Sequence, residues 1–319
     1  MDFAQEREVA ALSPYLLKRL LWFFPVMLGV SLVVFFFIHM IPGDPVMVML
    51  GESARPAQAE ALRASLHLDR PLHVQLALFF ADLAQGKMVS IFFQKPVFEV
   101  IRPRLLATFE LALFSMAIAV LIALPVGIVS AIKKNSWIDF LSRVFSLLGV
   151  SMPNFWLGPL LIILFSIWLG WLPVSGRGGI RHLILPSLTL GMAMAGLLSR
   201  MSRASMLEVL AAPYLRSGRA RGLSEASIIL RHALRNALIP ILTVIGLQFG
   251  ALLSGAFITE TIFAWPGIGR LLINAIFTRD FPLVQACVLV IAASYLTVNL
   301  LVDVCYALVD ARVRLWREQ

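Results

Sequence analysis

Charged residues are scarce in this sequence. Asp, Glu, Lys and Arg make up 14% of its 319 residues, whereas about 25% is usual for a soluble domain. Hydrophobic residues make up 60%, against roughly 45–50% in soluble domains. A chain this poor in charge and this rich in apolar residues is predicted to be an integral membrane protein.

Cysteine is also rare. Cys287 and Cys305 are the two in the sequence, and on one helix they would share a face about 27 Å apart. Cysteines at that separation cannot be joined by a disulfide. The sequence therefore offers neither a disulfide framework nor a cysteine-based metal cluster.

Several enzyme motifs are missing as well. There is no G-x-x-x-x-G-K-[ST] loop to hold ATP phosphates and no H-E-x-x-H pair to bind zinc. The serine and histidine arrangement that an intramembrane serine protease would need is not found either. We therefore predict that this chain has no catalytic residues and no metal site.

Six apolar stretches are long enough to cross a membrane, which takes roughly 20 residues each. The third is interrupted by Ser151-Met152-Pro153-Asn154, and the proline predicts a kink because it removes a backbone hydrogen bond. The predicted spans are residues 20–41, 105–132, 144–170, 184–202, 238–260 and 283–310. The fold class is thus all-α, with six transmembrane helices.

Basic residues are distributed unevenly between the spans. With the N-terminus inside, 16 Lys and Arg residues fall on the inner side and 11 on the outer side, seven of them in the long segment 42–104. Long loops cross membranes largely regardless of charge, and without that segment the ratio is 16 to 4. Both termini are predicted to be cytoplasmic. The Lys and Arg residues of the inner segments then account for the net charge of +9, which therefore does not indicate a nucleic-acid partner.

This topology divides the chain into segments. The long segment 42–104 is then external. It has helical patches at 57–68 and 74–83, and it begins with a turn in which Asp44 is predicted to act as a cap. The segments are a cytoplasmic N-terminal segment (1–19), the first span (20–41), a small external segment (42–104), a five-helix core (105–310) that contains a cytoplasmic loop (203–237), and a cytoplasmic tail (311–319).

Two spans carry small residues four positions apart, a spacing that lets helix backbones approach closely in lipid. The two rows are Ala119, Ala123 and Gly127, and Gly246, Gly250 and Ser254. The sequence leaves open whether these rows pack within this subunit or against a second membrane subunit.

The cytoplasmic loop 203–237 has its own structural signals. Gly222 suits the left-handed conformation that ends a helix, and Ser224 is placed to cap the next helix, with Glu225 near its positive end. Pro240 marks the return to the membrane. The residues therefore predict a helix, a glycine hinge and a second helix. A mere connector could be far shorter, so the loop is either a docking surface or a helical pair lying on anionic lipid.

The stretch YLRSGRARGLSEASIILRHALRNALIPILTVIGLQFG, residues 214–250, resembles the coupling loop of ABC-importer permeases of the dipeptide, oligopeptide and nickel family. Six further blocks resemble the family in order along the chain. They are HMIPGDPV (39–46), SMPNFWLG (151–158), ILPSLTLG (184–191), ETIFAWPGIGRLL (260–272), RDFPLVQ (279–285) and NLLVDVCYALVDARVR (299–314). One departure is at residues 86–90, where GKMVS replaces the family's G-D-[LF]-G-x-S and leaves the local geometry of the external segment open.

The resemblance implies a multi-pass permease subunit of the bacterial inner membrane that forms half of a translocation channel. Its implied partners are a homologous second permease, two cytoplasmic ATP-binding subunits that hold ATP and Mg, and an external solute-binding protein. The chain itself would hold no cofactor. Peptides, glutathione and nickel chelates are substrates of such permeases, and the sequence does not separate them. A secondary transporter, the main alternative, often carries internal repeats, and none is evident.

The resemblance also implies roles for particular residues. The residues expected to couple to the ATPases are Tyr214, Arg216, Arg219, Gly222, Leu223, Ser224, His232, Arg235, Asn236 and Pro240. Apart from the resemblance, polar or helix-breaking residues near the spans are candidates to line the translocation path, with packing in the bundle, or for Glu260 an interface structure around Trp265, as the alternative. These are Pro153, Asn154, Gln248 and Glu260.

Overall fold

The computed structural model describes residues 2–40, 44–51, 55–253 and 256–309. Within these ranges every regular element is a helix, and one isolated β-bridge joins Val89 to Pro96. The predicted all-α class is confirmed. The predicted tail 311–319 and the small residue Ser254 lie outside the described residues.

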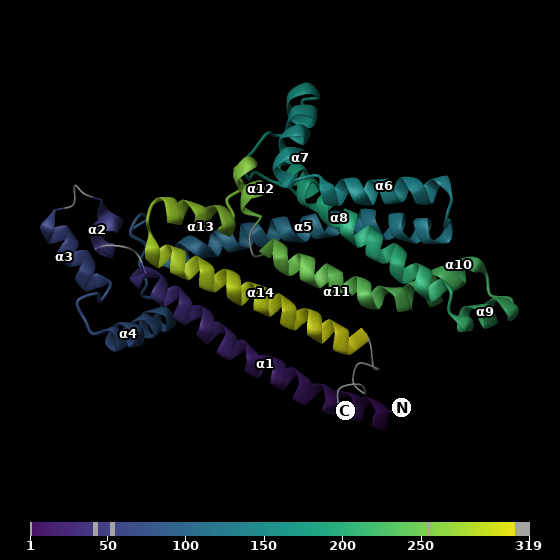
Figure 1. The fold of residues 1–319 in the computed structure, drawn as a ribbon, viewed down its shortest axis with the longest axis horizontal. Helices are drawn as coiled ribbons and strands as arrows, with labels where there is room; N and C mark the ends of the chain where they lie inside the picture. Colours follow the sequence, from purple (N-terminus) through teal and green to yellow (C-terminus); the bar gives the residue numbers. More distant parts are fainter. Residues whose placement is uncertain (1, 41–43, 52–54, 254–255, 310–319) are drawn as a thin grey trace.

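Long helices run side by side along the long axis of the molecule (Figure 1). These are α1 (Asp2–His39), α5 (Val97–Ile132), α6 (Trp137–Ser151), α8 (Ile180–Leu210), α11 (Leu234–Leu253) and α14 (Phe281–Val309). Shorter helices lie at the two ends and to one side of this bundle. They are α2 (Pro45–Leu50), α3 (Pro56–Ser65), α4 (Leu72–Gln85), α7 (Asn154–Leu161), the π-helix η1 (Ile162–Trp168), α9 (Pro213–Ala220), α10 (Glu225–Ser227), the π-helix η2 (Ile228–Ala233), α12 (Phe257–Ile262) and α13 (Ile268–Phe277).

The predicted number of spans agrees with these helices. Five are long and apolar enough to cross a membrane, and there are six if α6 and the sharply bent continuation α7–η1 count as one span. The predicted boundaries were less accurate. Helix α5 starts at Val97, inside the predicted external segment, and the fifth span ends at Leu253. The predicted span 238–260 had joined it to the separate helix α12.

The third predicted span is not a kinked helix but two helices bent by 104°. Met152 and Pro153 both have extended backbone conformations, and Pro153 is the N-cap of α7. A residue that precedes proline is driven out of the helical region by a steric clash. The chain therefore ends one helix and starts another in a new direction.

After this bend, α7 and η1 leave the bundle sideways and return through residues 169–179 (Figure 1). We call residues 154–179 the lateral arm. Its outer side chains are exposed, and Trp168 at the end of η1 is 76% exposed. Its base is fixed: the Gly176 N–H donates to the Phe263 carbonyl at 2.8 Å, and Arg177 forms an ion pair with Glu110 at 2.6 Å. The arm's direction is thus set by contacts within the chain.

Small residues bring α5 and α8 together at the centre of the bundle. Ala119 and Ala123 are fully buried. A Cβ atom at Gly127 would lie 2.7 Å from the Ser199 carbonyl oxygen, a distance that real Cβ contacts do not show. This row therefore packs within the subunit, which was one of the two arrangements left open by the sequence.

The second row packs in the same way, between α11 and α14. A Cβ atom at Gly246 would overlap the side chain of Val302, and one at Gly250 would lie 3.2 Å from the ring of Tyr295. Because lipid is as apolar as the helices, close backbone contact of this kind supplies much of the attraction between spans.

The external segment forms a small cap of helices beyond one end of the bundle (Figure 1). Helices α3 and α4 confirm the two predicted helical patches, and α2 is an additional helix. The Asp44 side chain accepts a hydrogen bond from the Val46 N–H at 3.1 Å, as predicted for a cap, and also pairs with Arg63.

The region that departs from the family pattern is held by Asp280, which precedes α14. Its carboxylate accepts hydrogen bonds from the Ser90 hydroxyl and from the backbone N–H groups of Ile91, at 3.2 Å, and Phe92, at 3.1 Å. Asp280 is buried, so these donors replace the water that the carboxylate has lost. The cap is thereby fastened to the bundle.

Gly246→Ala is expected to destabilise the protein by about 1–3 kcal/mol, because the added methyl group forces α11 away from the stiff side chain of Val302. Gly29→Ala is the matched control, since Gly29 lies within α1 and a Cβ atom added there would have no neighbour within 4 Å. Thermal unfolding in detergent measures both. Equal midpoints for the two variants would contradict the close packing of α11 on α14.

Candidate functional site

The loop between the fourth and fifth spans, residues 203–237, is folded as the sequence predicts. Helix α9 ends at Ala220, Gly222 has a left-handed backbone with φ of +81°, and the Ser224 side chain accepts from the Ser227 N–H at 3.3 Å. Few residues other than glycine adopt this φ without strain. The helix, the glycine turn and the capped second helix are all present.

Two polar clamps hold the helical pair closed. The Asn236 amide donates to the Tyr214 hydroxyl at 2.7 Å, and Arg219 donates to both carboxylate oxygens of Glu225, at 2.7 and 3.2 Å. Leu215 and Ile228 are buried between the helices. Tyr214, Arg219 and Asn236, all predicted coupling residues, thus contact other parts of the loop.

The second helix of the pair is continuous with the fifth span. Helices α10, η2 and α11 form one helical run from Glu225 to Leu253. Pro240, expected to mark the return to the membrane, lies inside α11 and does not begin a new helix. The π-helical stretch η2 lies between loop and span; such stretches are frequent at functional sites. A force on α10 is therefore applied directly to the fifth span.

The outer face of the helical pair combines apolar and basic side chains. Leu223 and Leu230 are exposed, Leu230 by 62%. The exposed basic residues of the pair are Arg216, Arg219, Arg221, Arg231 and Arg235. Exposed leucines beside cations are suited to a partner surface with both apolar and acidic groups.

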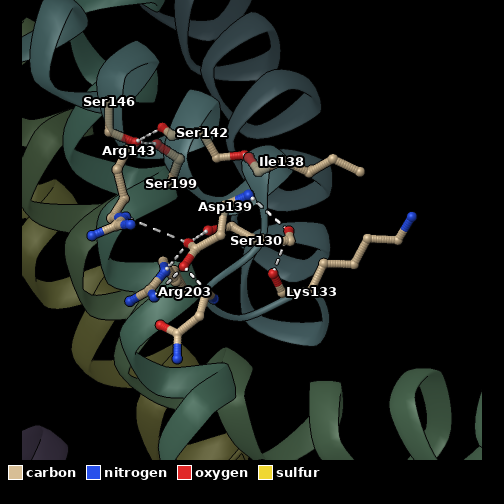
Figure 2. A network of polar contacts seen from close by, with 11 residues as sticks. Ser130, Lys133, Ile138, Asp139, Ser142, Arg143, Ser146, Ser199 and Arg203 are labelled. Carbon is tan, nitrogen blue, oxygen red and sulfur yellow. Dashed lines mark hydrogen bonds and ion pairs between the residues drawn. The ribbon is translucent and has the colours of Figure 1, made fainter.

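A buried ion pair lies where the fourth span enters this loop (Figure 2). Asp139 of α6 is fully buried, and Arg203 of α8 donates to its two carboxylate oxygens from Nε at 2.7 Å and Nη2 at 2.9 Å. The Ser130 hydroxyl of α5 donates at 2.7 Å, and the Asn135 N–H at 3.0 Å. One carboxylate thus joins the ends of three membrane helices.

The local sequence explains how Asp139 reaches this position. Ser136 is the N-cap of α6 and accepts from the Asp139 N–H at 3.3 Å, which places Asp139 in the first helical turn. Acidic residues are stabilised there by the helix dipole. The spacing of Ser136 and Asp139 indicates where a helix starts. It gives no information about Arg203, which is 64 residues further along the chain. The pair was not predicted, since nothing local indicates that partner.

A second buried carboxylate, Glu260, lies near the opposite end of the bundle. Its side chain accepts from the Thr108 hydroxyl at 2.7 Å and from the Arg270 N–H at 2.8 Å. Thr108 in turn accepts from the Ile268 N–H at 2.9 Å. Glu260 and Thr108 therefore cap the start of α13 together and fasten it to α5.

Burial raises the pKa of the Glu260 carboxyl, while the hydrogen bonds from Thr108, Arg270 and Gly269 act in the opposite direction. The side chain is completely enclosed by the protein. Glu260 was also predicted to line the translocation path, and that role stays a prediction.

The other predicted path residues lie elsewhere in the bundle. Pro153 and Asn154 form the bend between α6 and α7, and Gln248 is on α11. Among the described residues, no hydrogen-bond partner is found for the shielded Oδ1 atom of Asn154 or the Nε2 atom of Gln248. Buried polar atoms are nearly always paired. Path lining by these three residues stays a prediction.

Together these features define an all-α integral membrane protein with a structured loop between its fourth and fifth spans. The family of binding-protein-dependent transport system inner membrane components matches residues 123–315, and the corresponding N-terminal family matches residues 12–112. The chain belongs to this family, and is thus an inner membrane component of a binding-protein-dependent transport system.

Individual relatives cover nearly the whole chain. It is 44% identical over 94% of its length to the dipeptide transport system permease protein of Alkalihalophilus pseudofirmus, 99% of which is covered. It is also 44% identical to the glutathione transport system permease protein of Salmonella typhimurium and 43% identical to that of Escherichia coli K12, each over 94% of this chain and 98% of the relative.

Solved structures share the fold at lower sequence identity. An inward-facing methionine ABC transporter matches with a TM-score of 0.55, covering 67% of this chain and 98% of that one. An amino acid ABC transporter with histidines matches with a TM-score of 0.51, covering 65% and 93%. Both are 17% identical to this chain. At this identity the matches show a shared arrangement of helices.

Arg203→Ala is expected to reduce the free energy of unfolding by about 3–5 kcal/mol, because it leaves the fully buried Asp139 carboxylate without its charged partner. Asp139→Ala should cost less, because the Arg203 side chain that it leaves unpaired is 22% exposed to water, and the double variant should lose less than the sum of the two single losses. Arg143→Ala is the control, since this exposed arginine is 3.7 Å from Asp139 and should contribute under about 1 kcal/mol. Unfolding in mixed micelles measures all four; additive losses would contradict a direct interaction.

Thr108→Val is expected to destabilise the protein by about 1–3 kcal/mol, because it removes one hydrogen bond from the buried Glu260 carboxylate and leaves the Ile268 N–H without its acceptor. Thr108→Ser retains the hydroxyl and should remain within about 1 kcal/mol of the wild type. The unfolding midpoint in detergent distinguishes the two. If valine were tolerated as well as serine, the hydroxyl would not be fastening α13 to α5.

Proposed function

We propose that this chain is the non-catalytic half of the membrane channel of an ATP-driven importer. A homologous second permease would form the other half. Two cytoplasmic ATPases, which hold ATP and Mg, would bind the loop 203–237 of each half, and an external solute-binding protein would deliver the solute. In this proposal both termini are cytoplasmic. The absence of a phosphate-binding loop from the sequence supports an energy source on another chain.

The helical pair of loop 203–237 carries this proposal. It is clamped by Arg219–Glu225 and by Tyr214–Asn236, yet it exposes leucines and arginines. A preorganised surface loses little conformational entropy on binding. A flexible lipid-binding segment would need no such clamps. Docking to a folded partner is therefore the function that this geometry supports best.

Movement would reach the spans by two routes. The helical run from Glu225 to Leu253 makes the docked helix an extension of the fifth span. Arg203, at the other end of the loop, is bound to Asp139, so movement of α8 would also carry the ends of α5 and α6. ATP would favour the outward-facing state only to the extent that it binds the two states differently.

Small peptides are the solutes that we propose for this importer. The relatives named above are a dipeptide permease and glutathione permeases, and their identities of 43–44% extend over nearly the whole chain. The external binding protein would select among such peptides before they reach the membrane.

Gly222→Asp is expected to lower ATP-dependent peptide uptake at least tenfold, because a side chain is strained at the φ of +81° on which the loop's turn depends. Gly218→Ala is the matched control in the same loop, where an added Cβ would meet Leu223 at an ordinary 3.5 Å. Uptake of labelled di-alanine and glutathione, together with the subunits that co-purify from native membranes, tests the proposal.

The wild-type chain and Gly218→Ala should co-purify with a second permease and with ATPase subunits, and Gly222→Asp should lose the ATPases or their coupling to uptake. If no ATPase accompanies the wild-type chain even with ATP trapped, the loop is a lipid-surface helix and the docking proposal fails. Normal uptake by Gly222→Asp would refute the role of the turn.

A further inference from the structure

A cavity of about 470 Å³ lies between the external cap and the bundle. Its walls come from α1, the region of α3 and its following turn, α4, the segment 87–94 and the start of α14. Pockets for small molecules usually measure about 300–1,000 Å³ and combine an apolar lining with a few converging polar groups. This cavity has both properties, and the proposed docking of ATPases does not involve it.

The apolar side of the cavity includes two phenylalanines. Phe35 of α1 and Phe79 of α4 lie with ring centroids 5.5 Å apart, and Phe35 is nearly fully buried. Gln285 of α14 lines the cavity and donates to the Val34 carbonyl at 3.0 Å. The cavity is thus built on a fixed contact between two membrane helices, and the cap closes over it.

His39 lies on this wall and contacts α1 and α4 through its two ring nitrogens. Its Nδ1 atom lies 3.2 Å from the Phe35 carbonyl oxygen, and its Nε2 atom lies 2.9 Å from Oε1 of Gln75. The Gln75 amide is oriented by donating its own N–H to the Arg70 carbonyl at 2.8 Å. The ring of His39 is thus held between the Phe35 carbonyl and the Gln75 side chain.

Opposite charges meet at the rim. Asp82 of α4 accepts from Nε2 of His67 at 3.1 Å, and His67 is held in a left-handed backbone conformation with φ of +56°. Lys87 also lines the cavity, and within the described residues it has no ion-pair partner. The cavity thus offers an available ammonium group and a carboxylate, with two aromatic rings between α1 and α4.

We propose that this cavity binds a small peptide before it enters the membrane path. Lys87 would pair with the peptide's carboxylate, Asp82 with its amino group, and Phe35 and Phe79 would contact its side chains. A zwitterion with amide groups complements this set, because each of its ends meets an opposite charge and its middle meets aromatic and amide groups. The choice of a peptide as ligand rests on the proposed function, whereas the site rests on the cavity.

Direct binding tests this proposal without the external binding protein. The complete membrane complex in nanodiscs is dialysed to equilibrium against radiolabelled di-alanine, and separately against reduced glutathione. Saturable binding of at least one peptide is expected for the wild type. Lys87→Gln and Asp82→Asn should each weaken it at least tenfold. Lys87→Gln is the more informative variant, since no ion pair of the described chain is lost with it.

Matched controls lie just outside the cavity. Lys95→Gln makes the same change on the same segment, and Asp69→Asn makes the same change in the cap, where Asp69 pairs with Arg70 at 3.4 Å. Both should bind peptide as the wild type does. Equal binding by Lys87→Gln and Lys95→Gln would overturn the proposal, as would the absence of saturable binding to a wild-type complex.

Uptake by the complete wild-type system separates this inference from the proposed function. If the system imports a peptide but the membrane complex alone binds none, the function stands and the cavity site fails. If the complex binds a peptide through Lys87 and Asp82 but the system imports neither probe, the site stands and the proposed transport of small peptides fails.

Discussion

The carboxylate of Asp139 determines which helix ends stay together at the coupling side of this protein. It is buried, and an ionised carboxylate without partners is very costly in a low-dielectric environment. Arg203, Ser130 and the Asn135 N–H remove that cost only while α5, α6 and α8 keep their present positions. If one of these contacts breaks, the Asp139 carboxylate is left with too few partners. The ends of α5, α6 and α8 are therefore expected to move as one unit (Figure 2).

The rest of the bundle follows a different rule, since most of it is apolar. In lipid, packing leucine against leucine contributes little to the attraction between helices. Close approach of the helix backbones supplies that attraction instead. Gly127 and Gly246 allow that approach at the α5–α8 and α11–α14 contacts. Buried carboxylates fasten the helices near their ends, Asp139 on one side and Glu260 and Asp280 on the other. Further in, Ser146 of α6 and Ser199 of α8 share a hydrogen bond of 2.8 Å.

The sequence predicts local features of this molecule better than distant ones. The left-handed turn at Gly222, the cap at Ser224 and the helices of the external segment follow from neighbouring residues, and all were predicted. The 104° bend at Pro153 exceeded the expected kink, because proline indicates that a helix stops but not the direction of the next one. Asp139 with Arg203, and Glu260 with Thr108, are pairs separated by 64 and 152 residues. No local pattern identifies such partners, so neither pair was predicted from the sequence.

The lateral arm has a consequence for the assembly of this protein. Helix α6 has 15 residues, about 22 Å in length, so the bend falls within the roughly 30 Å hydrocarbon layer. The return through residues 169–179 is not helical, so its backbone polar groups need partners outside regular structure, as the Gly176 N–H finds in the Phe263 carbonyl. In the proposed complex, a second permease packed against this arm would supply partners for the groups that remain, and an unassembled chain would leave them exposed.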